Sequence, residues 1–209
     1  MNILITGATG FIGYNLANNY LNKKNNKVYG IDCLDDYYSV ALKKKRLQKL
    51  KKKKNFFFGK IDLCDYKNLD LFLKKKRFDI VIHLAAQAGV RYSIVNPQKY
   101  LKVNLYGYLN LLKLLTKYKA KKILYASSSS VYGENTNFPL KENEKLNPKN
   151  VYGLTKKLNE IIAEYYYRKF KTKIIGLRFF TVYGEWGRPD MFFLKLLLIY
   201  KCFKRASMQ

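Results

Sequence analysis

Two segments of the sequence carry side chains that could together remove a proton from a substrate hydroxyl. In the first, Tyr152 and Lys156 are four residues apart, a spacing that places both side chains on one face of a helix. A free tyrosine has a pKa of about 10, and a positive charge beside it lowers that pKa by favouring the phenolate. The pair therefore predicts a tyrosine that acts as a base near neutral pH. Because the chain has 19 tyrosines and many lysines, this spacing needs support from a second feature.

That second feature is a run of serines, Ser127–Ser130, followed by Val131-Tyr132-Gly133. The run comes at the end of a predicted strand, and the carboxyl ends of parallel strands line the ligand crevice of an open sheet. A serine hydroxyl here could hydrogen-bond a substrate oxygen and pass its proton to Tyr152. The alternative is a polar turn whose hydroxyls only cap the backbone.

A glycine-rich turn, Gly7–Gly13 (GATGFIG), lies between a short apolar run and a helical pattern. In that context the first glycine permits a tight turn, the second lets a pyrophosphate approach the backbone, and the third lets helix and strand pack closely. The start of the helix then offers free N–H groups to the anion, so the turn predicts a dinucleotide site. The residues expected to contact the dinucleotide here are Gly7, Gly10, Phe11, Ile12 and Gly13. The alternative is a generic glycine-rich turn.

Asp32 ends the next predicted strand, where its carboxylate could accept hydrogen bonds from the hydroxyls of an adenosine ribose. A carboxylate at this position would repel the 2′-phosphate of NADP, so the sequence favours NAD as the cofactor. The alternative is that Asp32 only caps the end of its strand.

Alternating strand and helix patterns would position these segments. The predicted strands are Asn2–Thr6, Lys27–Asp32, Phe56–Ile61, Phe78–Leu84, Lys122–Ser127 and Lys173–Phe179. The predicted helices are Phe11–Lys23, Ser39–Lys53, Leu69–Lys76, Pro97–Tyr118 and Tyr152–Lys169. This alternation predicts an α/β fold, a Rossmann-like doubly wound parallel sheet with helices on both faces. We expect residues 1–184 to form the dinucleotide-binding domain and residues 185–209, a loop and an apolar helix, to begin a second lobe.

Composition narrows the class of protein. The 209 residues are 48% hydrophobic, which favours one folded domain over disorder. We see neither a transmembrane stretch nor a secretory signal, and the three cysteines, at positions 33, 64 and 202, have no metal-binding or disulfide spacing. We therefore expect free thiols, no metal and a cytoplasmic protein. His83, the single histidine, lies in a predicted buried strand and is interpreted as a core residue.

The net charge of +27 raises the alternative of nucleic-acid binding. Lysine supplies most of this charge, whereas proteins that read bases rely on arginine. The densest run, residues 43–54, is interpreted as the exposed face and tail of one helix. We therefore expect no specific nucleic-acid partner, although the charge could attract an anionic small molecule.

With the glycine turn first, the serines next and YxxxK last, the chain resembles the extended short-chain dehydrogenases/reductases. The resemblance places the catalytic serine at Ser128, with Ser127 and Ser129 as competitors, because the family position is counted back from Val131-Tyr132-Gly133. It also implies further residues around NAD, beyond Tyr152 and Lys156. These are Asp62, Leu63, Leu84, Ala85, Ala86, Asn104 and Phe180.

Several segments, above all His83–Ser93 (HLAAQAGVRYS), resemble the UDP-glucuronate 4-epimerases. The resemblance implies that NAD⁺ removes hydride from C4 of UDP-glucuronate and returns it to the other face, which yields UDP-galacturonate. Related dehydratases and decarboxylases carry acidic residues where this chain has Ser129 and Ser130, so those reactions are disfavoured. The residues expected at the sugar nucleotide are Gln87, Arg91, Ser128, Thr181 and Arg188. For each of the two arginines, the alternative is an ordinary ion pair.

The resemblance also implies a homodimer formed by the helices over residues 97–118 and 152–169. It implies that most of a small carboxyl-terminal substrate lobe is missing, which would weaken or abolish turnover. Two alternatives remain open: an epimerase for another UDP-hexose, and a non-catalytic remnant that binds NAD.

Overall fold

The computed structural model describes residues 1–134, 138–191, 196 and 200. Its strands are β1 (Asn2–Thr6), β2 (Lys27–Asp32), β3 (Phe56–Lys60), β4 (Ile80–His83), β5 (Lys122–Ser128) and β6 (Lys173–Phe179). Its α-helices are α1 (Phe11–Leu21), α2 (Val40–Lys51), α3 (Tyr66–Leu73), α4 (Val90–Val95), α5 (Pro97–Tyr100), α6 (Gly107–Lys117) and α7 (Val151–Phe170). A π-helix, η1 (Leu101–Tyr106), and a 3₁₀ turn, η2 (Ser129–Val131), complete the described elements.

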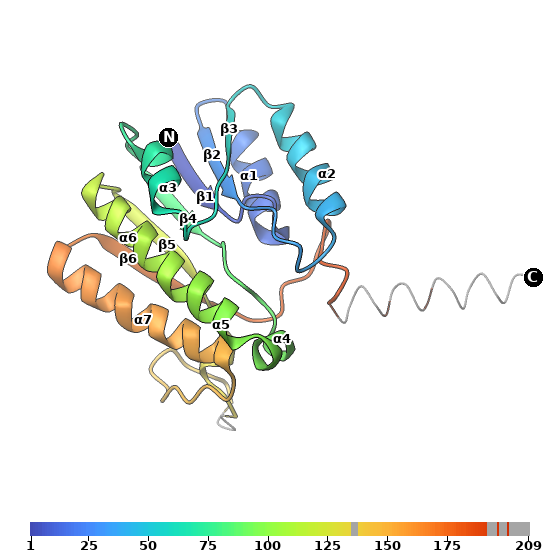
Figure 1. Cartoon of the computed structure of the whole chain (residues 1–209), viewed down its shortest axis with the longest axis vertical. Coiled ribbons are helices and arrows are strands. Elements are labelled where there is room, and N and C mark those ends of the chain that lie inside the picture. Colours follow the sequence, from blue (N-terminus) through green and yellow to red (C-terminus); the bar gives the residue numbers. More distant parts are fainter. Residues whose placement is uncertain (135–137, 192–195, 197–199, 201–209) are drawn as a thin grey trace, which may run out of the picture.

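The strands form a single parallel sheet in the order β3-β2-β1-β4-β5-β6. The order reverses between β1 and β4, and ligands of open α/β sheets bind outside the carboxyl ends of the strands at such a point. Helices α1 and α2 lie on one side of the sheet and α3, α6 and α7 on the other, as Figure 1 shows. The predicted α/β, Rossmann-like architecture is therefore confirmed.

Each face of the sheet has its own apolar core because strand side chains alternate between the two faces. On the α1 and α2 side, Ile3 and Ile5 of β1 pack with Tyr14 of α1 and Leu50 of α2. On the other side, Leu4 of β1 packs within a cluster built largely from the leucines of α6. The buried strands hold the loops at their carboxyl ends in fixed positions.

The structure corrects several predicted boundaries. Helix α3 begins three residues earlier than predicted, because the Asp65 carboxylate caps it by accepting a hydrogen bond from Asn68 N–H. The helix predicted over residues 97–118 is present as three successive segments, which are α5, the π-helix η1 and α6. Helix α4 was not predicted. The apolar helix expected after residue 185 falls mostly outside the described residues.

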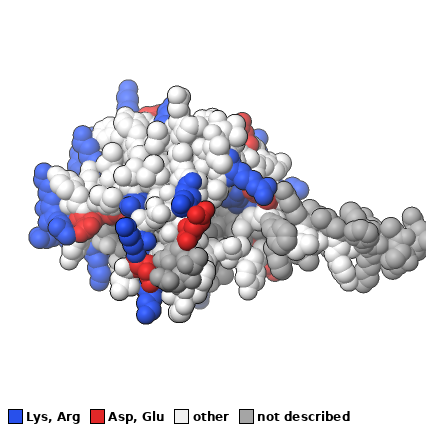
Figure 2. All heavy atoms as spheres, turned by 90° about the horizontal axis from the view of Figure 1, so that it is seen from below, with Lys and Arg blue, Asp and Glu red and all other residues white. Residues whose placement is uncertain are grey.

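The lysine-rich helix α2 is less exposed than the sequence suggested. Lys43 and Arg46 are buried, while Lys44, Lys45 and Lys49 remain exposed. Figure 2 shows lysine and arginine side chains scattered over one face of the molecule, with acidic side chains among some of them. In the described part of the chain, no helix is long and apolar enough to span a membrane.

His83 is a core residue, as the sequence predicted. Its ring is 5% exposed, stacks on Tyr108 with 5.1 Å between the ring centroids, and has Nδ1 2.7 Å from the Thr6 hydroxyl oxygen. That hydroxyl also accepts a hydrogen bond from Ala85 N–H at 3.2 Å, so it links the ring to the loop after β4. Burial disfavours the charged ring and lowers the pKa of His83 from 6.5 to about 3.

We predict that the imidazole of His83 stays neutral in the folded protein well below pH 6. Because the chain has one histidine, its ring carbon-bound protons give a single set of NMR signals to follow during a pH titration. The shifts should be constant from pH 7.5 to about 5 in native protein, whereas in urea they should titrate near pH 6.5. A native midpoint close to that of the unfolded chain would contradict the assignment.

Candidate active site

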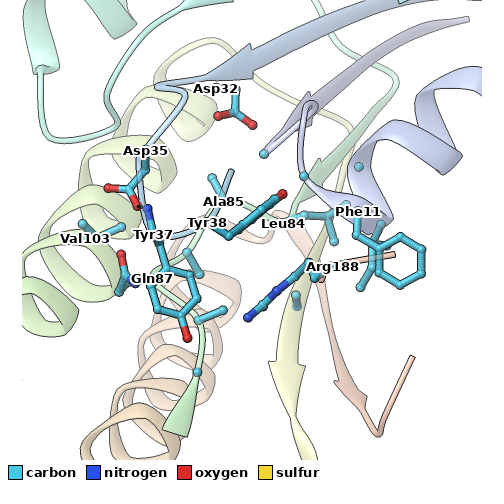
Figure 3. A pocket seen from close by; sticks show the side chains of 18 of the residues that line it. Phe11, Asp32, Asp35, Tyr37, Tyr38, Leu84, Ala85, Gln87, Val103 and Arg188 are labelled. Atoms are coloured by element: carbon cyan, nitrogen blue, oxygen red, sulfur yellow. Dashed lines mark hydrogen bonds between the residues drawn. The ribbon is translucent and has the colours of Figure 1, made fainter. Parts of the chain in front are cut away.

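A cavity of about 460 Å³ opens at the carboxyl ends of the strands. Figure 3 shows part of its lining, with side chains from the loops after β1, β2 and β4 facing the same space. The residues predicted from sequence that line this cavity are Gly7, Gly10, Phe11, Ile12, Gly13, Asp32, Asp62, Leu63, Leu84, Ala85, Ala86, Gln87, Ser128, Tyr152, Lys156, Phe180, Thr181 and Arg188. Arg91 and Asn104 do not line it.

The glycine turn packs so closely that larger residues cannot replace its glycines. Gly7 has a φ of +71°, and a Cβ on it would lie 2.8 Å from the backbone nitrogen of Ala85. A Cβ on Gly13 would lie 2.1 Å from the carbonyl oxygen of Gly7. No side chain caps the start of α1, so its first N–H groups are available to an anion from the cavity. The turn thus fits a pyrophosphate group.

Asp32 caps the end of β2 and lines the cavity. Its Oδ2 accepts a hydrogen bond from Thr9 N–H at 3.0 Å and its Oδ1 accepts one from Leu34 N–H at 2.8 Å, so it braces two loops. Each carboxylate oxygen has a further lone pair for a ribose hydroxyl. Asp62 is exposed and accepts a hydrogen bond from Cys64 N–H, so it is a turn residue that also faces the cavity.

Ser128, Tyr152 and Lys156 come together at one end of the cavity. Ser128 ends β5 and hydrogen-bonds the Tyr152 phenol, while its own oxygen accepts from Ser130 N–H at 3.2 Å. Tyr152 lies in the first turn of α7 because Asn150 caps that helix through Gly153 N–H. Lys156 is 3% exposed, donates to the Ala126 carbonyl at 2.8 Å, and has its Nζ 5.9 Å from the centroid of the Tyr152 ring.

The pKa values of these groups differ from the sequence expectation. Burial raises the pKa of Tyr152, and the hydrogen bond from Ser128 and the charge of Arg188 lower it by less. Burial also lowers the pKa of Lys156 from 10.5 to about 8. The net effect of the protein on Tyr152 therefore favours the neutral phenol over the phenolate.

Ser127 and Ser128 both line the cavity, but the pleat of β5 gives their hydroxyls different partners. The hydroxyl of Ser127 donates to Oε1 of Glu160 on α7 at 2.5 Å. Glu160 in turn forms two hydrogen bonds with Arg178 of β6, at 3.0 and 2.8 Å, and Arg178 reaches the Tyr132 hydroxyl at 3.0 Å. This network holds both ends of the serine run against α7. Sequence reasoning missed it, although Glu160 lies one helical turn after Lys156.

Gln87 and Arg188 are two further polar side chains that line the cavity. Gln87 is 4% exposed, and its side-chain nitrogen, which lies near the Tyr100 hydroxyl, has no hydrogen bond of good geometry to any described residue. A buried donor without a partner is costly, so this atom fits a ligand oxygen. Arg188 lies over the faces of Tyr37 and Tyr38, with centroid distances of 5.4 and 5.7 Å, and pairs with Asp190. Sequence reasoning missed both tyrosines.

Asn104 is a positioning residue behind the cavity. Its side chain accepts a hydrogen bond from Gln87 N–H at 2.8 Å and donates to the Gln87 carbonyl and the Thr155 hydroxyl, both at 3.1 Å. It lies within the π-helix η1, and such bulges are frequent at functional sites. Arg91 is exposed on the short helix α4, outside the cavity.

The loop after β2 forms another wall that the sequence did not predict. Asp35 pairs with Lys99 of α5 at 2.8 Å, and its carbonyl accepts a hydrogen bond from the buried Lys43 at 2.5 Å. These contacts hold Tyr37 and Tyr38 over the cavity. Among the described residues, no three histidine, cysteine, aspartate or glutamate side chains are grouped to hold a metal ion.

Comparison with known proteins places this geometry in a family. Residues 4–204 match the family model described as GDP-mannose 4,6 dehydratase. The protein CapI of Staphylococcus aureus is 45% identical over 93% of this chain and 58% of its own length. UDP-glucuronate 4-epimerase 4 of Arabidopsis thaliana is 42% identical over 94% of this chain and 46% of its own length.

A solved structure has a similar fold. The UDP-glucuronic acid 4-epimerase of Bacillus cereus, in complex with UDP-glucuronic acid and NAD, has a TM-score of 0.88 and 36% identity over 94% of this chain and 62% of that one. The chain spans about three fifths of the length of the first curated relatives it matches. It belongs to the GDP-mannose 4,6-dehydratase family of extended short-chain dehydrogenases/reductases.

Proposed function

We propose that this chain is the cofactor-binding part of an NAD-dependent 4-epimerase that acts on UDP-glucuronate. The observation that carries the proposal is the group formed by Ser128, Tyr152 and Lys156 in the same cavity as the uncapped glycine turn. Relatives named as UDP-glucuronate 4-epimerases, and a solved structure that holds NAD and UDP-glucuronic acid, support it.

The residues around the cavity fit NAD. The start of α1 would hold the pyrophosphate, and Asp32 would receive the adenosine ribose hydroxyls and exclude a 2′-phosphate. Bound NAD⁺ would supply a hydride acceptor for C4 of the sugar and the positive charge that the Tyr152 phenolate requires. Lys156, buried beside the phenol, would add its positive charge to the stabilisation of the phenolate. Its amine would keep its hydrogen bond to the Ala126 carbonyl.

Proton transfer would pass through the side chains of the protein. Ser128 would hydrogen-bond the 4-hydroxyl of the sugar, and Tyr152 would accept its proton and later return it. Because the oxygen of Ser128 accepts Ser130 N–H, the serine's own proton is directed away from the backbone. A hydride that returns to the other face of the 4-keto sugar gives the inverted alcohol with no net oxidation.

The acidic residues of the cavity favour epimerisation over dehydration. The aspartates that line it are Asp32, Asp35 and Asp62. They lie at or after the ends of β2 and β3, whereas Ser128 lies on β5, farther along the sheet. Ser129 and Ser130 occupy the positions after Ser128, and a hydroxyl cannot act as a carboxylic acid. We assign the sugar carboxylate to Arg188 and Thr181, which line the same cavity. The Asp190 carboxylate accepts hydrogen bonds from Nε and Nη2 of Arg188, so an anionic substrate would accept a hydrogen bond from Nη1.

Two further features of the protein belong to this proposal. Exposed apolar side chains on η1, α6 and α7 support a homodimer; they are Leu101, Tyr106, Leu109, Leu154, Ile161 and Tyr165. A UDP-sugar reaction and the free thiols of Cys33 and Cys64 support a cytoplasmic location.

The proposal predicts that the chain, supplied with NAD⁺ and UDP-glucuronate, forms UDP-galacturonate, which NMR of the anomeric protons detects. Tyr152→Phe should reduce the rate by about 10²–10⁴-fold while the protein still binds NAD, because it removes the base and leaves the contacts of the glycine turn in place. UDP-glucose and UDP-N-acetylglucosamine are the comparison substrates. Conversion of either in preference to UDP-glucuronate would overturn the substrate assignment, and NAD binding without any conversion would favour the non-catalytic alternative.

The buried amine of Lys156 predicts a specific pH dependence of stability. Between pH 8 and 10.5 the unfolded chain binds the Lys156 proton more tightly than the folded protein does. The free energy of unfolding therefore increases as pH rises through this window. Over this window the gain is about 3 kcal/mol, and the Lys156→Met variant should lack it. Urea unfolding of both proteins at a series of pH values measures the difference. Parallel curves would show that Lys156 titrates normally.

The dimer predicts that Ile161→Glu, which places a charge on the outer face of α7, produces a monomer. Ile161 is 53% exposed, so the folded subunit should tolerate the change. Leu71→Glu is the matched control, since Leu71 is 58% exposed on α3, a helix that carries none of the residues proposed for the interface. Light scattering after gel filtration gives the mass of each. A wild-type monomer, or equal behaviour of the two variants, would exclude this interface.

A further inference from the structure

Arg46 is a buried arginine that connects two parts of the cavity wall. It is fully buried on α2. Its Nη1 donates to the carbonyl of Thr9 at 3.0 Å and to the Tyr38 hydroxyl at 2.7 Å, and its Nη2 donates to the carbonyls of Trp186 at 2.5 Å and Gly187 at 3.3 Å. The guanidinium thus joins the glycine turn to the segment around Trp186, which lies 140 residues after Arg46 in the chain.

The segment that Arg46 holds is the turn over residues 185–188. Trp186 has a φ of +61°, a strained value for a residue with a side chain, so outside contacts must hold it there. Its ring packs on Tyr14 of α1 at 5.4 Å between centroids and lies under the Lys49 amine at 5.1 Å. Asn15 of α1 also donates to the carbonyl of Glu185 at 3.0 Å.

This turn carries Arg188 to the sugar end of the cavity. Arg188 lies on the ring faces of Tyr37 and Tyr38, and Tyr38 is the same residue whose hydroxyl accepts from Arg46. Thr9, at the other end, is fixed on both sides, since its N–H donates to Asp32 and its carbonyl accepts from Arg46. A single guanidinium therefore contacts the backbone of the cofactor turn and the supports of the substrate arginine.

We propose that Arg46 is a positioning residue that couples cofactor binding at the glycine turn to the placement of Arg188 at the sugar end. The inference deepens the proposed function and rests on it for the identity of the two ligands. Planar donors in a fixed fork suit this role, because a guanidinium can hold several carbonyls in one geometry and an amine cannot. A cofactor that orders the glycine turn orders the Trp186 turn through the same contacts.

Trp186 is the only tryptophan of the chain, so its fluorescence reports on this turn alone. In the wild-type protein, NAD⁺ should lower the acrylamide quenching constant of Trp186, because binding fixes Thr9 and with it Arg46. Unchanged quenching at a NAD⁺ concentration that saturates the protein, as shown by calorimetry, would overturn the coupling.

Substitution gives the second test. Arg46→Met should shift the Trp186 emission to longer wavelength, raise its quenching and weaken NAD⁺ binding by about fivefold or more, the lower end of typical couplings between sites. Lys45→Met is the matched control, because Lys45 is an exposed neighbour on the same helix, and it should change none of the three. A folded Arg46→Met protein with wild-type fluorescence and affinity would refute the positioning role.

A third variant covers the case in which Arg46→Met does not fold by circular dichroism. Arg46→Lys keeps a positive charge at this position, but an amine cannot hold the carbonyls of Thr9, Trp186 and Gly187 in one geometry, so Trp186 quenching should rise. Wild-type quenching in this variant would overturn the proposal. If wild-type protein binds no NAD⁺, the proposed function fails, while the fluorescence of ligand-free Arg46→Met or Arg46→Lys still decides whether these contacts hold the turn.

Discussion

The close approach of the glycine turn to its neighbours is the constraint on which the site depends. Gly7 touches the backbone after β4, and Gly13 lies against the carbonyl of Gly7, at separations that leave no room for a Cβ. This packing brings the start of α1 to the point where the order of the strands reverses, between β1 and β4. The uncapped N–H groups of α1 and the loop with Gln87 therefore face one cavity.

Strand β5 gives the same cavity its chemistry through simple alternation. Ser128 hydrogen-bonds Tyr152, while the hydroxyl of Ser127 is held by Glu160 of α7. The ion pair of Glu160 with Arg178 is shielded, with side-chain exposures of 17% and 19%, so it keeps strands β5 and β6 and helix α7 in one arrangement. The hydroxyls of the proposed active site thus depend on an ion pair that does not line the cavity.

Lys156 and Arg46 are buried cations at this site, and carbonyl oxygens accept hydrogen bonds from both. Lys156 donates to Ala126 next to the serines, and Arg46 donates to Thr9, Trp186 and Gly187. A buried charge is expensive without such partners, and replacing it with an apolar residue often leaves a protein folded. Their positions, at the phenol and between the two ends of the cavity, indicate that function maintains them.

The sequence alone determined the α/β class, most strands and the grouping of the glycine turn, serines and YxxxK pair, because these depend on local spacing and strand order. It could not show what holds the serine run in place, since the contact of Ser127 with Glu160 requires the position of β5 against α7. Nor could it place Arg91 outside the cavity, Asn104 behind it, or Lys43 and Arg46 inside an apparently solvent-facing lysine run. Those placements arise from contacts between residues far apart in the chain, such as Arg46 with Trp186, which only the tertiary structure brings together.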